Sequence, residues 1–309
     1  MAPTALLAPV VRLVLALVLA PLLLGIITRT KAFFAGRRGA PLLQPYRDLG
    51  KLLRKGAVYS RTTTWVFRAG PIVGLAALLL ATALVPCAGE KSLVSFPGDL
   101  VLFAGLLGLA RLLTVLAALD TGSSFEGMGA SREVLVSALA EPALLVSLLA
   151  VARMTGELSL GGMVAGVSAH WATAGPVLAL VVATLVVVYL AENARIPVDD
   201  PTTHLELTMI HEVMVLDHGG PDLAFILYAS ALKLWVLGAL VVSLLVPLRS
   251  GIPLLDAAAF GAGMAGLAVV TGVVESSMAR LRLSWVPQLL VGAASLSVLA
   301  LFLVLWVTP

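Results

Sequence analysis

The sequence predicts an all-α membrane protein with eight transmembrane helices. Hydrophobic residues make up 60% of the 309-residue chain, charged residues make up 12%, and the mean hydropathy is +1.05. Soluble domains carry about twice that charged fraction. At about 20 apolar residues per spanning helix, the composition supports about eight spans and leaves little chain for a soluble domain. We therefore expect a single membrane domain over residues 1–309.

Eight apolar stretches are long enough to cross a bilayer. They cover residues 4–27, 70–87, 100–119, 134–152, 172–190, 223–246, 257–274 and 286–307. The polar segments between them alternate between two sides. One side receives 28–69, 120–133, 191–222 and 275–285, and the other receives 88–99, 153–171 and 247–256. An even number of spans places both termini on one side.

Lysine and arginine predict the orientation, because cytoplasmic loops retain the excess of positive charge. The first set of loops holds fourteen of these residues and the second set holds three. The sequence therefore predicts a multi-pass protein of the cytoplasmic membrane with both termini on the outer side. Twelve of the seventeen carboxylates also lie in the first set, against four in the second. Chemistry and partners are thus expected on the cytoplasmic face.

The first cytoplasmic loop is expected to contain an amphipathic helix that follows Pro45. In a helix, Tyr46, Leu49 and Leu53 share one side, and the cations gather on another. A segment of this kind lies flat at the interface and directs its cations toward lipid phosphates. A simple topology anchor explains the same charges.

The loop 191–222 holds most of the candidate chemistry, with seven carboxylates and three of the four histidines. Asp200 before Pro201, and a Thr203–Glu206 pair, predict a helix start. Gly219-Gly220-Pro221 predicts the end of that helix.

The three histidines of this loop, His204, His211 and His218, would lie seven residues apart on one stripe of that helix. Two turns separate neighbours by about 11 Å, which is too far for ligands of one metal ion. We therefore expect partner contacts or a proton relay from these residues, and no metal site.

Four ionisable residues fall inside predicted spans: Arg12, Arg111, Glu141 and Lys233. An unpaired charge at the centre of a span costs at least ~2.5 kcal/mol, so each needs a partner or a water-filled path. Arg12 is close enough to the outer end to snorkel. For the other three, structural pairing and ion conduction both remain open. The single cysteine, Cys87, cannot bind an iron–sulfur cluster, so any redox cofactor must belong to a partner.

Three blocks of sequence resemble a known family, the membrane subunit shared by respiratory complex I and the energy-converting group 4 [NiFe]-hydrogenases. The blocks are Gly39-Ala40-Pro41-Leu42-Leu43-Gln44-Pro45-Tyr46-Arg47-Asp48 with Lys51-Leu52-Leu53; Ala130-Ser131-Arg132-Glu133 with Leu139-Ala140-Glu141-Pro142; and Ala191 to Asp222. The spans between the blocks agree in number and order, so the resemblance covers nearly the whole chain.

The third block distinguishes two branches of this family. Complex I subunits typically read Ala-Glu-x-x-Arg-x-Pro-Phe-Asp, followed by Glu-Leu-Val and Glu-Tyr. Here residues 191–209 read AENARIPVDDPTTHLELTM, which is similar to the formate hydrogenlyase and hydrogenase-4 membrane subunits. Ser131-Arg132-Glu133 is similar to the same branch. Glu126 departs from it, because a small or uncharged residue is expected there.

The resemblance implies a membrane-anchor and ion-coupling subunit of an energy-converting hydrogenase or formate hydrogenlyase. It would seat the hydrogenase large and small subunits on its cytoplasmic loops and link electron transfer to H⁺ or Na⁺ translocation through antiporter-like membrane subunits. The [NiFe] centre and the iron–sulfur clusters would belong to partners, and this chain would bind no cofactor and no nucleic acid. A subunit of a quinone-reducing complex and, more distantly, a stand-alone secondary transporter are the alternatives.

The residues expected to act fall into two groups. The ion-coupling group is Glu141, Glu192, Asp199, Glu206 and Glu212, together with the in-span cations Arg111 and Lys233. The partner-docking group is Gln44, Arg47, Asp48, Arg132, Glu133, Arg195, Asp200, His204 and His211, with Arg195 also orienting its loop.

Overall fold

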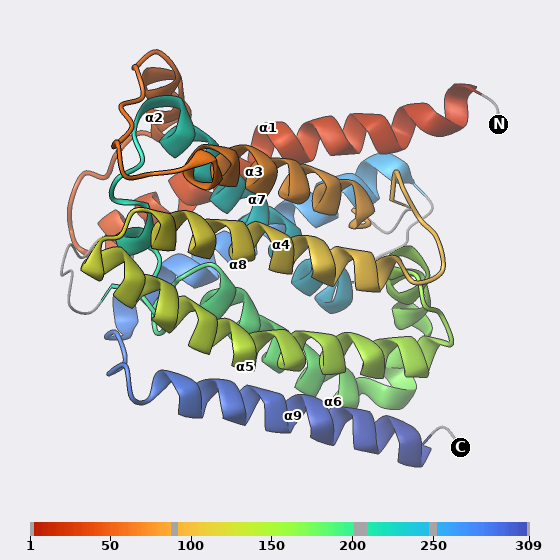
Figure 1. Ribbon diagram of the computed structural model, residues 1–309. Helices are drawn as coiled ribbons and strands as arrows, with labels where there is room; N and C mark the ends of the chain where they lie inside the picture. The colour runs from red at the N-terminus through yellow and green to blue at the C-terminus, as the bar shows by residue number, and fades with distance from the viewer. Residues whose placement is uncertain (1–2, 88–91, 201–208, 247–251, 308–309) are drawn as a thin grey trace.

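The computed structural model describes residues 3–87, 92–200, 209–246 and 252–307, and its helices lie side by side in one bundle (Figure 1). The long helices are α1 (Pro3–Phe34), α3 (Trp65–Leu84), α4 (Asp99–Asp120), α5 (Ser124–Thr155), α6 (Leu160–Glu192), α7 (Gly220–Leu245), α8 (Pro253–Ser277) and α9 (Val286–Val307). All eight are long and apolar enough to cross a membrane. The prediction of an all-α protein with eight spans is confirmed.

The first helix begins and the last helix ends at the same end of the bundle (Figure 1). The short helix α2 (Gln44–Leu53) lies at the opposite end. Pro45 stands in its first turn, and the Tyr46 hydroxyl donates a hydrogen bond to the Val18 carbonyl of α1. The structure therefore contains the helix expected after Pro45, attached to α1. Which side of the membrane each end faces stays a prediction.

Two helices extend well beyond the predicted spans. The apolar stretches 134–152 and 172–190 predicted only the central parts of α5 and α6, and the segments 120–133 and 153–171 were expected to be loops. Those loop expectations are wrong over most of their length. The additional turns contain charged side chains, such as Glu126 and Glu133, that are buried against other parts of the chain. Hydropathy detects only the apolar part of such a helix.

The helix predicted between Asp200 and Gly219 is also wrong in its described part. Residues 201–208, which include His204 and Glu206, lie outside the described residues, and 209–219 contain only a short 3₁₀ turn, η1 (Glu212–Val215). Gly219-Gly220-Pro221 begins α7 instead of ending a helix. Proline fits the first helical turn because its missing N–H has no intrahelical partner there. His211 and His218 therefore do not share a helical stripe.

Gly220 is required at the start of α7. Its φ of 55° lies in the left-handed region, and a Cβ atom there would lie 2.7 Å from the Gly56 carbonyl oxygen. This close approach fixes the loop before α3 against α7. Helix α7 is the most buried of the spans, and it contacts α1, α3, α6 and α8. Polar residues on its inner surface are thus shielded from lipid.

Candidate functional site: a buried charge cluster

Arg111, in α4, lies at the centre of a group of charged side chains from four helices. Its Nη1 atom donates to Glu141 Oε1 of α5, and its Nη2 atom donates to Glu192 Oε2 of α6. The Nε atom lies 3.6 Å from Glu133 Oε1, also of α5. Lys233 of α7 completes the group, with its Nζ atom 2.8 Å from Glu192 Oε2. We call these five residues the Arg111 cluster.

Helix geometry explains how one arginine reaches two carboxylates of the same helix. Glu133 and Glu141 are eight residues apart in α5, which separates their backbones by about 12 Å along the axis. The planar guanidinium offers five N–H donors in a fixed fork and therefore bridges the two side chains. Glu192 is the last residue of α6 and is 7% exposed. The in-span charges thus have the partners that their burial requires.

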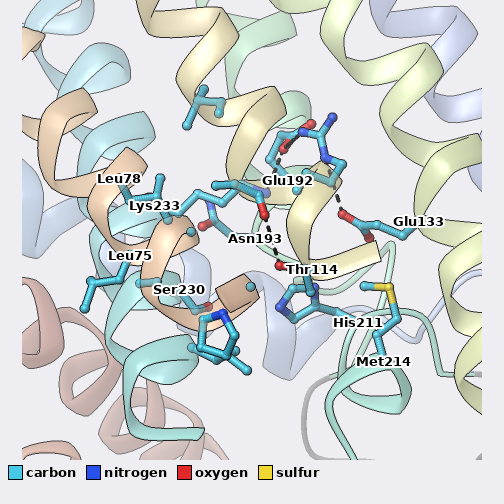
Figure 2. Close-up of a pocket in the computed structure, with 18 residues that line it drawn as sticks. Leu75, Leu78, Thr114, Glu133, Glu192, Asn193, His211, Met214, Ser230 and Lys233 are labelled. Atoms are coloured by element: carbon cyan, nitrogen blue, oxygen red, sulfur yellow. Dashed lines mark hydrogen bonds and ion pairs between the residues drawn. The ribbon is translucent and has the colours of Figure 1, made fainter. Parts of the chain in front are cut away.

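A cavity of about 60 Å³ adjoins the cluster, and this volume has room for a few water molecules. Figure 2 shows Glu133, Glu192, Lys233 and His211 around the same space. Small residues of α3, among them Gly70 and Gly74, line another part of it.

Glu141 occupies a different position from the other carboxylates of the cluster. Its side chain is 43% exposed, and its Oε1 atom lies within 3.5 Å of the place that a Cβ atom on Gly108 would occupy. The absence of a side chain at Gly108 leaves this carboxylate open to the α4–α5 surface. The cluster therefore extends from the cavity to the outer surface of the bundle.

Three charged side chains fix the loop that contributes His211. Asp199 Oδ2 accepts hydrogen bonds from the Ile210 and His211 amides at 3.0 and 3.2 Å. Arg132 donates to the Met209 carbonyl at 2.9 Å, and Glu126 accepts from the Asp217 amide at 3.1 Å. Glu126, the departure from the family pattern, therefore anchors this loop to α5.

The environment of His211 favours the neutral imidazole. Burial lowers its pKa, and the positive charges of Lys233 and Arg111 act in the same direction, whereas Glu133 and Asp199 oppose them. His218 lies in the same loop and stacks on the Phe67 ring, with ring centroids 3.9 Å apart. Burial also lowers the pKa of His218.

A second buried group of charges joins α1, α8 and the chain after α6. Glu275 accepts ion pairs from Lys31 at 2.9 Å and from Arg195 at 3.3 Å, and its side chain is 0% exposed. We call these three residues the Glu275 cluster. The sequence did not predict it, because Glu275 follows the span 257–274 by one residue and was assigned to a loop. The position of Glu275 in the last turn of a span was the feature of the sequence that could have indicated a buried carboxylate.

The structure brings together four residues of the expected coupling group: Arg111, Glu141, Glu192 and Lys233. Asp199, another member of this group, pairs with Arg280 at 2.9 Å and holds the loop.

The residues expected at the docking surface are divided between the interior and the exterior. Glu133 and His211 line the cavity, and Arg195 pairs with Glu275. The exterior members that the structure describes include Gln44, Arg47 and Asp48 on α2, where Gln44 donates to Asp48 at 2.8 Å. Glu212 is half-buried, and the amide of half-buried Asp200 donates to the Asp199 carboxylate.

Fold and site together define a multi-span helical membrane protein with a polar interior at the junction of four helices. The chain belongs to the NADH dehydrogenase family, whose family model matches residues 7–308. It is 30% identical to formate hydrogenlyase subunit 4 of Escherichia coli over 91% of this chain and 92% of that protein. It is 32% identical to hydrogenase-4 component C of Escherichia coli over 76% of this chain and 73% of that protein. The resemblance inferred from the three sequence blocks is confirmed.

Two further similarities extend this placement. A subunit of the NADH-quinone oxidoreductase of Rubrobacter xylanophilus is 33% identical over 56% of this chain and 52% of its own length. Among solved structures, a chain of the membrane-bound sulfane sulfur reductase, an archaeal respiratory membrane complex, matches with a TM-score of 0.81. That match has 21% identity and covers 96% of this chain and 98% of the other, so it establishes the fold.

Proposed function

We propose that this protein is the membrane-anchor and ion-coupling subunit of an energy-converting hydrogenase-like complex. Its similarity to formate hydrogenlyase subunit 4 along nearly the whole chain supports this assignment. In this proposal the hydrogenase large and small subunits sit on the end of the bundle that bears α2. They carry the [NiFe] centre and the iron–sulfur clusters, and antiporter-like membrane subunits lie beside the bundle.

The observation that carries the coupling role is the charge balance of the Arg111 cluster. Three carboxylates, Glu133, Glu141 and Glu192, face two cations, Arg111 and Lys233. With all five groups ionised, the cluster has a net charge of −1, and every side chain except that of Glu141 is at most 13% exposed. An uncompensated buried charge is costly, so a proton or a bound cation neutralises the cluster. A site that requires one extra positive charge is suited to pass an ion on.

Within the cluster, Glu133 is the residue that takes up this charge. It has the longest contact with Arg111, 3.6 Å, whereas Glu192 contacts both cations. His211 also lines the cavity, and its imidazole can accept a proton on one ring nitrogen while it releases one from the other, so it relays a proton to Glu133. The partly exposed Glu141 then passes the charge to a neighbouring membrane subunit.

The loop held by Asp199, Arg132 and Glu126 links this cluster to the redox partner. A partner that binds over residues 209–219 contacts the backbone that positions His211. A change in the partner during electron transfer would therefore alter the distance between His211 and Glu133. In this proposal, that distance controls proton uptake.

The purified assembled complex provides the test of this function. We expect nickel and iron in the complex, hydrogen evolution from an artificial electron donor in detergent, and a transmembrane ion gradient in sealed proteoliposomes. Glu133→Gln should preserve hydrogen evolution and reduce the gradient at least tenfold. Glu157→Gln, on the exposed segment before α6, is the matched control and should change neither. An intact complex without nickel that reduces a quinone would refute the hydrogenase assignment and favour the complex I-like alternative.

We also propose that the α2 end of the bundle faces the cytoplasm, with the protein in the cytoplasmic membrane. The fourteen-to-three distribution of lysine and arginine supports this orientation. Alkaline phosphatase fused after Arg153 should be active, and the same enzyme fused after Gly50 should be inactive. Strong activity after Gly50 would reverse the orientation.

A further inference from the structure

An apolar groove lies between α1, the chain just before α2, and α8. Its lining includes Ile26, Phe33 and Leu42 on one side and Val269 and Val273 on the other. The groove has a volume of about 590 Å³, within the range of about 300–1,000 Å³ typical of small-molecule sites. Phe33 is 78% exposed and Val269 is 43% exposed, so the groove opens on the outside of the bundle. Its occupant is therefore apolar over most of its length.

The groove carries one charged side chain, Arg29. The other polar residue, Thr30, donates its hydroxyl to the Ile26 carbonyl at 2.9 Å and so has its hydrogen-bonding need met within the helix. Arg29 is exposed, and within the described residues it has no carboxylate partner. The groove thus combines an apolar surface with one available guanidinium.

A second, more polar cavity of about 440 Å³ lies around the end of α1 and shares Phe34 with the groove. Lys31, Arg37 and Arg38 line it together with Glu275. The Glu275 carboxylate is already paired with Lys31 and Arg195. Arg37 and Arg38 are exposed, and they too lack a carboxylate partner in the described part of the chain. The ligand that fits this end of α1 carries negative charge.

The depth of Arg29 in the bilayer agrees with a lipid headgroup as its partner. The spanning part of α1 has 27 residues, Ala8–Phe34, and is therefore about 40 Å long. The hydrocarbon core of a bilayer is about 30 Å thick, so about 5 Å of a centred α1, its last turn, lies in the headgroup region. Arg29 lies five residues, about 7.5 Å, before the end of the helix, so its long side chain reaches the headgroup region by snorkelling, with Ile26 of the groove on its core side and Phe33 on its headgroup side.

We propose that this groove binds an anionic phospholipid. One acyl chain lies along Ile26 and Val273, and Arg29 binds the phosphate, with Arg37 and Arg38 attracting the remaining headgroup charge. The lipid covers the contact between α1 and α8, next to the Glu275 cluster. This inference is independent of the hydrogenase assignment, because it uses only the outer surface of the bundle.

The test measures lipid retained by the assembled complex after purification in a mild detergent. The complex is exchanged into nanodiscs of phosphatidylcholine that contain a minor fraction of phosphatidylglycerol, then re-extracted, and the retained lipid is identified by native mass spectrometry. We expect retention of phosphatidylglycerol in preference to phosphatidylcholine. Arg29→Gln should weaken this retention about fivefold, the effect of one basic residue near an anionic surface.

Two variants make the result specific to the groove. Val273→Trp fills the apolar part of the groove without a change of charge and should also abolish retention of the lipid. A free phosphate ion bound to Arg29 does not use the apolar part, so its binding would not change in this variant. Arg54→Gln, at the exposed end of α2, removes a cation elsewhere on the same end and should have no effect. Equal losses for Arg29→Gln and Arg54→Gln would show general surface attraction and overturn the proposal. Unchanged retention in Val273→Trp, or a partner protein seated in the groove of the assembled complex, would also overturn it.

Discussion

The Arg111 cluster and the Glu275 cluster are both buried groups of charge, but they have opposite balances. The Arg111 cluster has three carboxylates and two cations and borders a cavity with room for water. The Glu275 cluster has one carboxylate between two cations; that side chain is 0% exposed, and Lys31 and Glu275 border the polar cavity at the end of α1. With all groups ionised, the first has a net charge of −1, whereas the one carboxylate of the second is paired with two cations. Burial of charge alone therefore does not identify a site of ion transfer.

The two clusters also connect different parts of the protein. The Arg111 cluster joins α4, α5, α6 and α7 through carboxylates that differ in exposure, from 3% for the Glu192 side chain to 43% for Glu141. The Glu275 cluster joins α1 and α8 to the segment after α6. Carboxylates of graded exposure suit the passage of an ion, and a single carboxylate with 0% exposure suits a structural role. Substitutions that remove charge from one cluster at a time test this distinction.

Arg111→Met should produce the largest effect. It leaves three carboxylates with Lys233 as the one remaining cation of the cluster, and breaking a buried ion pair in this way costs about 3–5 kcal/mol. We expect little assembled complex in the membrane and a strongly lowered thermal midpoint for any that forms. Membrane abundance on immunoblots and thermal unfolding of the purified complex measure this.

The charge-preserving control is Arg111→Lys. Lysine retains one positive charge but cannot bridge three carboxylates, because it lacks the planar fork of donors. Abundance should recover in part while the ion gradient stays low. Full recovery of the gradient would show that charge, without the bridging geometry, is sufficient.

Glu275→Gln should be the next largest effect, and it should act on stability alone. The substitution leaves Lys31 and Arg195 without their carboxylate and costs about 3 kcal/mol. The thermal midpoint of the complex should fall, while the ion gradient per assembled complex should equal that of the unmodified protein. If Glu275→Gln reduced the ion gradient per assembled complex as much as Glu133→Gln does, Glu275 would lie on the ion path. The distinction between the two clusters would then be wrong.

Glu141→Gln should show the reverse pattern. Because this side chain is partly exposed, its ion pair contributes little to stability, about 1 kcal/mol or less. Hydrogen evolution in detergent should continue, and the gradient in sealed vesicles should fall at least tenfold. Loss of assembly together with both activities would indicate a structural pairing role for Glu141.

Much of the architecture and part of the site could be predicted from the sequence. Hydropathy located all eight spans, and the cost of burying charge identified Arg111, Glu141 and Lys233 as residues that need partners. The position of Glu133 could not be predicted in this way, because a polar extension of α5 reads as a loop in any hydropathy profile.

The loop 209–219 shows a different reason for failure. Its backbone is fixed by side chains from distant parts of the sequence, Asp199, Arg132 and Glu126, and local capping signals carry no information about such contacts. The Gly-Gly-Pro sequence is compatible with a helix end or a helix start. The packing of Gly220 against Gly56 decides between them, and this contact joins residues more than 160 positions apart.

The smallest expected effect concerns His218 and separates the acid sensitivity of this loop from that of the Arg111 cluster. Burial lowers the pKa of His218 in the folded protein, although Asp217 and Asp222 oppose the shift. Below the unfolded pKa of about 6.5, the unfolded chain therefore binds more protons than the folded chain. The stability due to the neutral ring is fully present above about pH 6.5 and decreases as the pH falls toward the lowered pKa.

His218→Phe keeps a ring to stack on Phe67 but removes the titrating group. We expect the fall in thermal midpoint between pH 7.5 and pH 5.5 to shrink by about 2 °C, while the remaining fall includes that due to His211. An undiminished pH dependence in His218→Phe would assign the acid sensitivity of the complex to the Arg111 cluster and His211 instead.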